Sequence, residues 1–277
     1  MQELIQIDLH KILRERVPKG KLIPGFLISG LEKIVHQDEL NAVLKDKYPA
    51  TGSEFAQGIY DYFGISIEVE GIENIPDKGK FIFASNHPLG GLDGIGLITV
   101  LGKRYGDDGV RFMVNDMLMN VAPLRTVFLP INKYGSQGRE AAVKIREAFE
   151  SDMQMVVFPA GLVSRLGSDN IVQDLKWQKS FITKAIEFKR DIIPVRFVGL
   201  NRRRFYNIAK WRKKLGLKVN VEQALLPAEL CAAKGAKFKV IFGKPVSWQS
   251  LAKAVEEGKS PLELAARIRH LVYAMKP

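Results

Sequence analysis

The sequence is poor in the residues that build disulfides and many metal centres, with one cysteine and four histidines in 277 residues. A single thiol excludes an internal disulfide and fits a reducing compartment. Cys231 stands in Leu230-Cys231-Ala232-Ala233, which predicts a buried helical position. No histidine lies near it in the sequence, so Cys231 lacks the neighbouring base that would favour a nucleophilic role.

Long hydrophobic runs are also missing. The longest apolar stretches, Leu22–Leu31 and Gly91–Leu101, are too short to cross a bilayer. The first ten residues, Met1–His10, lack the basic start and apolar run of a secretory signal. If the protein meets a membrane, we therefore expect it to lie on the surface of the bilayer rather than to span it.

Negative charge is in deficit. Lys and Arg number 42 against 30 Asp and Glu, which gives a formal net charge of +12. This excess predicts an anionic partner, and nucleic acid, an anionic membrane surface and a phosphorylated or acidic carrier all fit it. Many basic proteins bind no polyanion, so the charge by itself does not choose among these alternatives.

Apolar periodicity divides the chain into an N-terminal helical segment, residues 1–63, and an α/β domain, residues 64–277. The first segment is expected either to dock on a membrane or to pack on the core, and Ser53 is expected to cap one of its helices. In the second, strands alternate with helices, which predicts a largely parallel central sheet flanked by helices. Strands are expected at 65–70, 80–85, 110–114, 127–131, 155–158, 192–198 and 238–242, and helices at 94–105, 136–150, 175–189, 202–215 and 261–275.

The strand at 80–85 runs directly into a glycine turn, at a place where α/β sheets commonly form their sites. The turn reads Asn86-His87-Pro88-Leu89-Gly90-Gly91-Leu92-Asp93. A neutral imidazole there can act as a general base, and a carboxylate across the turn can orient it and stabilise its charged form. The pair also fits a simpler interpretation, in which His87 is a turn residue and Asp93 caps the next helix. The remaining histidines lie in helical stretches and are expected to be surface or packing residues: His10, His36 and His270.

Other kinds of site are disfavoured. One histidine and one aspartate are too few ligands for a metal, and the sequence has no further cluster of histidine or cysteine, so no metal is expected. The Gly-x-Ser-x-Gly elbow of a serine hydrolase is missing. The glycines form neither a Walker phosphate loop nor a dinucleotide-binding fingerprint.

The glycine turn resembles the first sequence block of the glycerolipid acyltransferase family, the group that includes lysophosphatidic acid acyltransferase. That family carries Asn-His-x-x-x-x-Asp after a strand, and this sequence has one residue more between His87 and Asp93. Later stretches are similar to the family's further blocks in order and spacing: Phe128–Asn132, Val157–Gly161 and Ile193–Val195. The resemblance implies a glycerolipid acyltransferase-like fold and an enzyme that moves a fatty acyl group from a thioester to a lipid acceptor.

The third of these blocks departs from the family pattern, because Ala160 stands where an acidic residue is usual, with Ser164-Arg165 close behind. With the glycine turn, it is similar to a hemolysin-like branch associated with bacterial synthesis of aminolipids such as ornithine and glycine lipids. That branch implies a lyso-aminolipid acceptor acylated on a 3-hydroxyl, with lysophosphatidic acid as the alternative. Acyl carrier protein or coenzyme A would bring the acyl group, and no cofactor beyond this co-substrate is expected.

The resemblance also assigns roles within the site. His87 is expected to deprotonate the acceptor and Asp93 to orient it, while backbone N–H groups of the Gly90-Gly91 turn or around Gly161 are candidates to bind the oxyanion. Arg165 is the first choice for an anionic group of the acceptor or for phosphopantetheine, although a solvated loop arginine fits equally, and Arg125 and Lys133 are weaker choices. The residues expected to bind substrate are Asn86, Gly90, Gly91, Asn132, Pro159, Gly161 and Arg165.

A basic stretch near residue 200 predicts a membrane-facing surface. Basic side chains and aromatic rings together suit anionic headgroups and the bilayer interface, and the stretch 22–31 can dock on the same surface. We therefore expect a peripheral protein on the cytoplasmic face of the inner membrane, with no nucleic-acid partner. The stretch comprises Arg202–Arg204 and Lys210–Lys214 with the aromatics Phe205, Tyr206 and Trp211.

Two alternatives stay open. A nucleic-acid-binding protein would use the same basic stretch on phosphates, with Tyr206 or Trp211 stacked on bases, although no recognised binding motif is present. A catalytically inactive relative would only bind lipid or a carrier, and Ala160 keeps that interpretation open.

Overall fold

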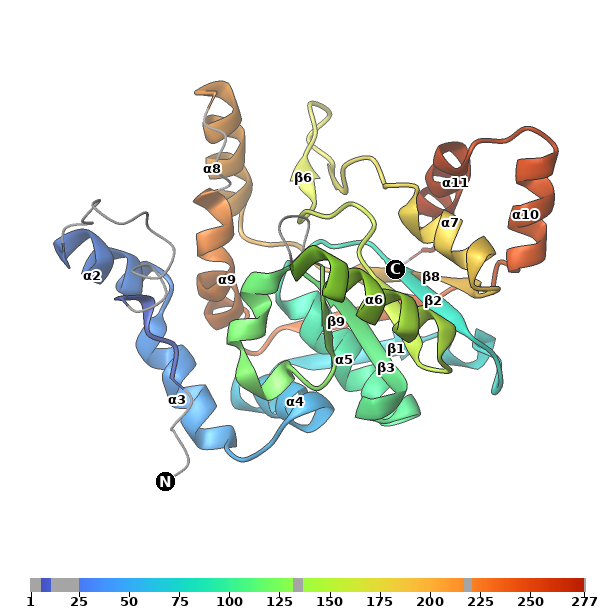
Figure 1. Cartoon of the computed structure of the whole chain (residues 1–277). Helices are drawn as coiled ribbons and strands as arrows, with labels where there is room; N and C mark the ends of the chain where they lie inside the picture. The colour runs from blue at the N-terminus through green and yellow to red at the C-terminus, as the bar shows by residue number, and fades with distance from the viewer. Residues whose placement is uncertain (1–5, 11–24, 132–136, 217–220, 277) are drawn as a thin grey trace.

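The computed structural model describes residues 6–10, 25–131, 137–216 and 221–276. Its main strands are β1 Ser66–Glu70, β2 Phe81–Ser85, β3 Val110–Val114, β4 Phe128–Pro130, β5 Gln154–Val157, β8 Asp191–Val198 and β9 Lys237–Phe242. These strands form one central sheet (Figure 1), in the order β1-β9-β8-β2-β5-β3-β4. Neighbours are parallel except β8 and β9, so the prediction of a largely parallel sheet is confirmed, with β1 and β9 reversed at one edge.

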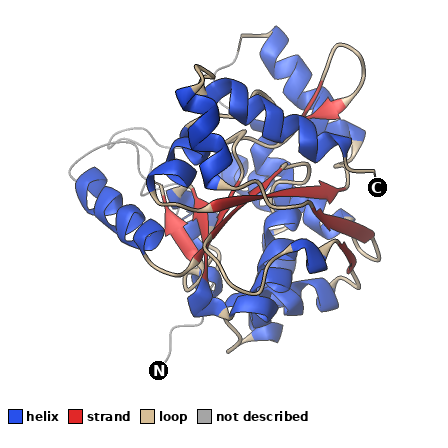
Figure 2. Cartoon of the chain, turned by 90° about the vertical axis from the view of Figure 1, so that its right-hand side faces the viewer, coloured by secondary structure: helices blue, strands red, loops and turns tan. Residues whose placement is uncertain are grey.

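Helices lie on both faces of this sheet (Figure 2). The central strand β2 is buried throughout: Phe81 and Phe83 enter one core, and Ile82 and Ala84 enter the other. Such a strand is apolar without alternation because helices cover both of its faces. The described helices are α2 Gly25–Ile34, α3 Gln37–Lys47, α4 Gly52–Tyr62, α5 Leu92–Tyr105, α6 Gln137–Glu150, α7 Ser180–Glu187, α8 Arg203–Lys214, α9 Leu226–Ala232, α10 Trp248–Glu256 and α11 Pro261–Ala274.

Short elements complete the fold. A small antiparallel hairpin, β6 Arg165–Leu166 with β7 Val172–Gln173, stands apart from the main sheet. Neither this hairpin nor α10 was predicted from the sequence. Single 3-10 turns occur at η1 Ile72–Asn74, η2 Asp107–Gly109, η3 Asp116–Asn120, η4 Ala122–Leu124 and η5 Val221–Leu225.

The helices before residue 64 do not all stand apart from the sheet. Phe55, Ile59 and Phe63 of α4 and its end join the same apolar core as α5 and the central strands. The predicted cap at Ser53 is wrong, because α4 begins at Gly52 with Thr51 as its cap residue, while the Ser53 N–H donates to Asp107 at 3.0 Å. The boundary at residues 63 and 64 stays a prediction. Among the described residues, no helix is long and apolar enough to cross a membrane.

One predicted helix begins five residues late. The pattern predicts a helix from Leu175, but α7 starts at Ser180. The preceding residues are held in a loop because the indole of Trp177, buried in the core, donates from Nε1 to Asp174 Oδ2 at 2.8 Å. Side-chain hydrogen bonding in this loop therefore replaces the first predicted helical turn.

A buried arginine holds the end of α6. Arg190 is completely buried and donates to the backbone oxygens of Ala148, Phe149, Ser151 and Met153. The last carbonyl groups of a helix have no partners within the helix, so one guanidinium satisfies several of them at once. Burial lowers the pKa of Arg190 to about 10, with the charge of Asp152 acting in the opposite direction.

Candidate active site

The predicted glycine turn leaves the end of β2 and enters α5. Asn86, its first residue, is buried, and its side-chain amide donates to the Phe197 oxygen at 2.9 Å and accepts from the Phe197 N–H at 2.7 Å. Both polar atoms are thus bonded to the backbone of β8. These bonds position the turn, and a role of Asn86 in substrate binding stays a prediction.

His87 and Asp93 meet across this turn. The imidazole Nδ1 lies 3.1 Å from each carboxylate oxygen of Asp93. The Asp93 side chain is completely buried and that of His87 is 18% exposed, so one edge of the ring stays accessible. A carboxylate only accepts hydrogen bonds, so it favours the tautomer with the proton on Nδ1 and leaves the Nε2 lone pair available as a base.

Asp93 is more than a helix cap. It lies within the first turn of α5, whose cap residue is Gly91, so the interpretation as an N-cap is wrong. Its Oδ2 accepts from the N–H groups of Leu89 at 2.9 Å and Gly90 at 3.3 Å, and its Oδ1 accepts from Gly94 at 2.8 Å. The carboxylate therefore fixes the turn and the imidazole together.

A second carboxylate, that of Asp174, holds His87 through its backbone N–H group. Its Oδ1 accepts from the His87 backbone N–H at 3.1 Å and from Ser164 Oγ at 2.5 Å. The Ser164 N–H in turn donates to the His87 oxygen at 2.8 Å. Burial raises the pKa of Asp174, and the bonds from Ser164 and Trp177 partly oppose that rise. Asp174 lies 87 residues from His87, and no local pattern in the sequence points to it.

Opposing influences set the basicity of His87. Burial lowers the pKa of the imidazole, but the charge and hydrogen bond of Asp93, with the charge of Asp174, outweigh burial. Arg165 acts in the lowering direction. The net result is a raised pKa, which suits a base that takes a proton during reaction and returns it afterwards. The ring also stacks on Phe158, with centroids 4.1 Å apart.

Arg165 is brought beside this site in a buried ionic cluster. Its Nη2 donates to Glu222 Oε1 at 2.7 Å, and Arg212 Nε donates to Glu222 Oε2 at 2.8 Å. Two guanidinium groups therefore share one fully buried carboxylate. Burial lowers the pKa of Arg165, and Glu222 acts against that effect. Arg165 Nη1 is buried and has no hydrogen-bond partner within the described residues, so this is no solvated loop arginine.

The candidate oxyanion donors divide into two groups. The Gly161 N–H donates to the Phe158 oxygen at 2.9 Å, and the Gly90 N–H donates to Asp93, so neither is a free donor. Gly90 has φ +82, and a β-carbon there would come 2.7 Å from the Leu226 side chain, so the turn requires glycine. Gly91 is exposed and has open space around it. Its role as a donor stays a prediction.

The remaining predicted residues are Pro159, Arg125, Asn132 and Lys133. Pro159 is buried and its oxygen accepts from the Gln178 N–H at 2.9 Å. Arg125 is exposed and donates to the Met119 oxygen at 2.6 Å. Asn132 and Lys133 lie outside the described residues.

The prediction of a membrane-facing surface near residue 200 is wrong in part. Phe205 and Tyr206 of α8 are buried in a small core with Val163 and Leu225 instead of facing a bilayer, which also removes Tyr206 as a base-stacking residue. Trp211, in contrast, is 61% exposed.

Cys231 is helical as predicted but only half-buried, and burial raises the pKa of its thiol to about 12, with Glu39 acting in the same direction. A protonated thiol is a poor nucleophile.

The sheet places a histidine–carboxylate pair at the end of a strand, with a buried arginine alongside. This arrangement suits a group transfer in which the histidine, as a general base, activates an anionic acceptor. The chain belongs to the Acyltransferase family, whose model matches residues 11–275, and it is an acyltransferase. It is 43% identical over 273 residues to the lyso-glycine lipid O-acyltransferase of Bacteroides thetaiotaomicron, covering 98% of each chain.

Two further similarities complete the comparison. The chain is 42% identical over 270 residues to the lyso-glycine lipid O-acyltransferase of Phocaeicola vulgatus, covering 97% of this chain and 95% of that one. Among solved structures, it is similar to PlsC, the 1-acyl-sn-glycerophosphate (LPA) acyltransferase of Thermotoga maritima. That match has a TM-score of 0.48 at 18% identity and covers 89% of each chain.

Proposed function

We propose that this acyltransferase moves a fatty acyl group from a thioester to the 3-hydroxyl of a lyso-glycine lipid. The two lyso-glycine lipid O-acyltransferases are similar to this protein over nearly the whole chain, which supports a lyso-glycine lipid as the acceptor. The observation within the molecule that carries the proposal is Arg165 Nη1, buried near the base without a partner among the described residues. A carboxylate on the acceptor would supply that partner.

His87 would act directly on the acceptor hydroxyl. Its Nε2 takes the hydroxyl proton as the oxygen attacks the thioester carbonyl, and Asp93 stabilises the resulting imidazolium. The tetrahedral intermediate collapses as the carbon–sulfur bond breaks, and the imidazolium returns the proton to the departing thiolate. No covalent enzyme intermediate is needed, because the thioester already activates the acyl group.

The arginine cluster fits a carboxylate headgroup. Arg165 pairs with the buried Glu222 through Nη2, while its buried Nη1 has no hydrogen-bond partner among the described residues. A buried donor without an acceptor is costly, and an acceptor carboxylate bonded to Nη1 would remove that cost. The terminal carboxylate of an N-acylated glycine has the required charge and planar geometry.

The acyl donor and the membrane complete the proposal. Either acyl carrier protein or acyl-coenzyme A would supply the thioester, and no further cofactor is required. The exposed face of α8 carries Arg203, Lys210, Lys213 and Lys214 together with Trp211, which supports peripheral binding to anionic lipid on the cytoplasmic face of the inner membrane. The inward side chain of Arg212 on the same helix is bonded to Glu222, so the helix lies close to the site.

Purified protein given an acyl thioester and competing acceptors tests the acceptor assignment. We expect a diacylated product from N-(3-hydroxyacyl)glycine in preference to lysophosphatidic acid. Arg165→Ala should raise KM for the glycine acceptor about 10- to 100-fold, because a hydrogen bond to a charged group contributes roughly 1.5–3 kcal/mol. The exposed Arg146→Ala on α6 is the matched control and should leave KM unchanged. Preference for lysophosphatidic acid would contradict the proposal.

A further inference from the structure

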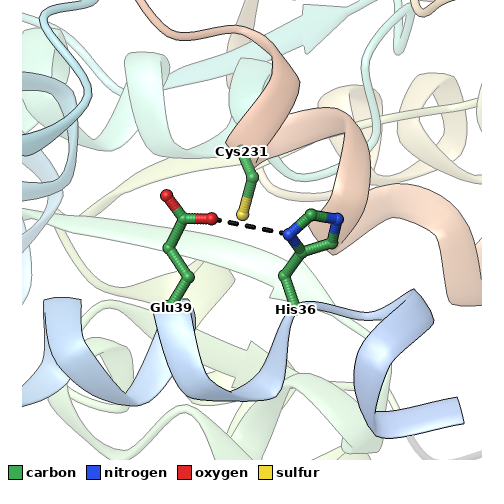
Figure 3. Close-up of side chains that lie close together, drawn as sticks. All are labelled: His36, Glu39 and Cys231. Atoms are coloured by element: carbon green, nitrogen blue, oxygen red, sulfur yellow. Dashed lines mark ion pairs between the residues drawn. The ribbon is translucent and has the colours of Figure 1, made fainter. Parts of the chain in front are cut away.

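Three side chains with metal-binding atoms lie close together in the fold. None of them is near His87, the proposed base, in the sequence. His36 lies in the turn between α2 and α3, Glu39 lies in the first turn of α3, and Cys231 lies in the last turn of α9. One ligand atom from each lies within 4.8 Å of the other two. Figure 3 shows the sulfur of Cys231 pointing between the Glu39 carboxylate and the His36 imidazole.

We propose that His36, Glu39 and Cys231 bind a zinc ion, with water as the fourth ligand. Imidazole nitrogen, thiolate sulfur and carboxylate oxygen are all zinc ligands, at about 2.0–2.3 Å in tetrahedral sites. The His36 Nδ1 already lies 3.5 Å from Glu39 Oε2, a separation that two ligands of one ion adopt with little movement. As the zinc–sulfur bond forms, the thiol proton passes to solvent.

The charge and the access suit a divalent ion. A thiolate and a carboxylate together neutralise the two charges of zinc, and the neutral imidazole adds none. The side chains of His36 and Glu39 are 45% and 40% exposed, so an ion reaches them from solvent. A cavity of about 260 Å³ adjoins the cluster at His36 and leaves room for a water ligand. Its other lining residues are Lys33, Ile34, Arg202, Arg204, Leu225, Ala228 and Glu229.

The position of the ion gives it a structural consequence. It would join the α2–α3 turn to α9, two parts of the chain that lie side by side at one end of the molecule (Figure 1). The first residue of α9, Leu226, lies over Gly90 in the turn that holds His87. A bound zinc would therefore fasten the N-terminal helices to the helix that covers the turn.

Cobalt substitution tests the site directly, because Cys231 is the only thiol in the chain. Tetrahedral Co²⁺ bound to a thiolate gives a near-ultraviolet charge-transfer band and visible d–d bands, which zinc then removes by displacement. Titration of the full chain with Co²⁺ should give these bands at one ion per chain. Zinc should also raise Tm, since a ligand that binds only the folded state stabilises it.

Variants separate the proposed site from accidental binding. Cys231→Ser should abolish the charge-transfer band, and His36→Asn and Glu39→Gln should each weaken zinc binding by at least roughly tenfold. Asparagine tolerates the left-handed backbone of His36, whose φ is 56, so that variant should fold. His270→Asn, on an exposed position of α11, is the control and should keep every band. No band in the unmodified chain, a band that survives Cys231→Ser, or one cobalt per two chains would each overturn the proposal.

Discussion

The backbone N–H of His87 donates to the carboxylate of Asp174 at 3.1 Å, so the proposed base is held from its main chain as well as from its ring. Asp174 also accepts from Ser164, whose own N–H returns to the His87 oxygen. The loop that follows the third sequence block therefore holds the first block in place through Ser164 and Asp174. This arrangement makes Asp174 a positioning residue for the imidazole.

Asp174→Asn should lower kcat by about tenfold and leave the acceptor KM nearly unchanged, because the carboxylate touches the histidine backbone and not the substrate. The variant should also lose roughly 1–3 kcal/mol of unfolding free energy, the usual cost of disturbing a buried hydrogen-bonded group. Steady-state kinetics and denaturant unfolding measure the two effects. Asp169→Asn, in the exposed turn between β6 and β7, is the control. A raised KM with unchanged kcat would contradict the positioning role.

The pH dependence should follow the raised pKa of His87. The free base is the active form, so kcat/KM should rise with pH and level off above that pKa, which lies above the usual value of 6.5. The negative charge of Asp93 favours the imidazolium, so Asp93→Asn should move this limb to lower pH and reduce the plateau by about 100- to 10,000-fold. A pH profile of kcat/KM for both proteins provides the measurement. A limb that stays in place in the variant would show that Asp93 does not set the basicity of the histidine.

Membrane binding should depend on the outer face of α8. Trp211 is 61% exposed, and Lys213 and Lys214 lie beside it at the end of the helix. The double reversal Lys213→Glu and Lys214→Glu should weaken binding to anionic vesicles by at least tenfold, since each basic residue contributes about 1 kcal/mol near such a surface. Vesicle co-sedimentation at two salt concentrations measures this change.

Matched variants on another exposed surface serve as controls for α8. Lys253→Glu on α10 reverses a side chain that is 76% exposed, and Leu271→Ala on α11 removes an apolar side chain that is 47% exposed. Both should bind vesicles as the unmodified chain does. Equal losses in these controls would mean that total charge, and not the face of α8, governs binding.

Arg190 should matter for stability and not for chemistry. Arg190→Met keeps the buried volume roughly similar but leaves the carbonyl groups at the end of α6 without their donor. We expect a loss of about 3 kcal/mol in unfolding free energy. Activity per folded molecule should persist at low temperature, since Arg190 lies at the opposite end of β5 from the site. Denaturant unfolding and kcat measured on the same preparation distinguish these effects.

Local patterns in the sequence were sufficient to predict the sheet and the pairing of His87 with Asp93. Buried strands such as β2 and β8 are short apolar runs, and His87 and Asp93 are close enough in sequence for one turn to join them. Helix ends were less well predicted where a side chain competed with the helix, as Asp174 does by accepting from Trp177 before α7.

Contacts between distant residues could not be predicted in this way. Glu222, which pairs with Arg165, lies 57 residues from it, and no local pattern links the two. Phe205 and Tyr206 stand among basic residues that favour a surface, yet the hairpin and η5 cover them. Burial in both cases depends on how separate elements pack, which a single sequence does not encode in any short window.

The central claim is that His87 deprotonates a hydroxyl on a glycine-containing lysolipid. Its most direct test is mass spectrometry of the product formed from an acyl thioester and N-(3-hydroxyacyl)glycine by the unmodified chain and by His87→Ala. The account predicts diacylated glycine lipid from the first, and turnover reduced by about 100- to 10,000-fold in a variant with unchanged unfolding free energy. Near-normal product formation by His87→Ala would contradict it.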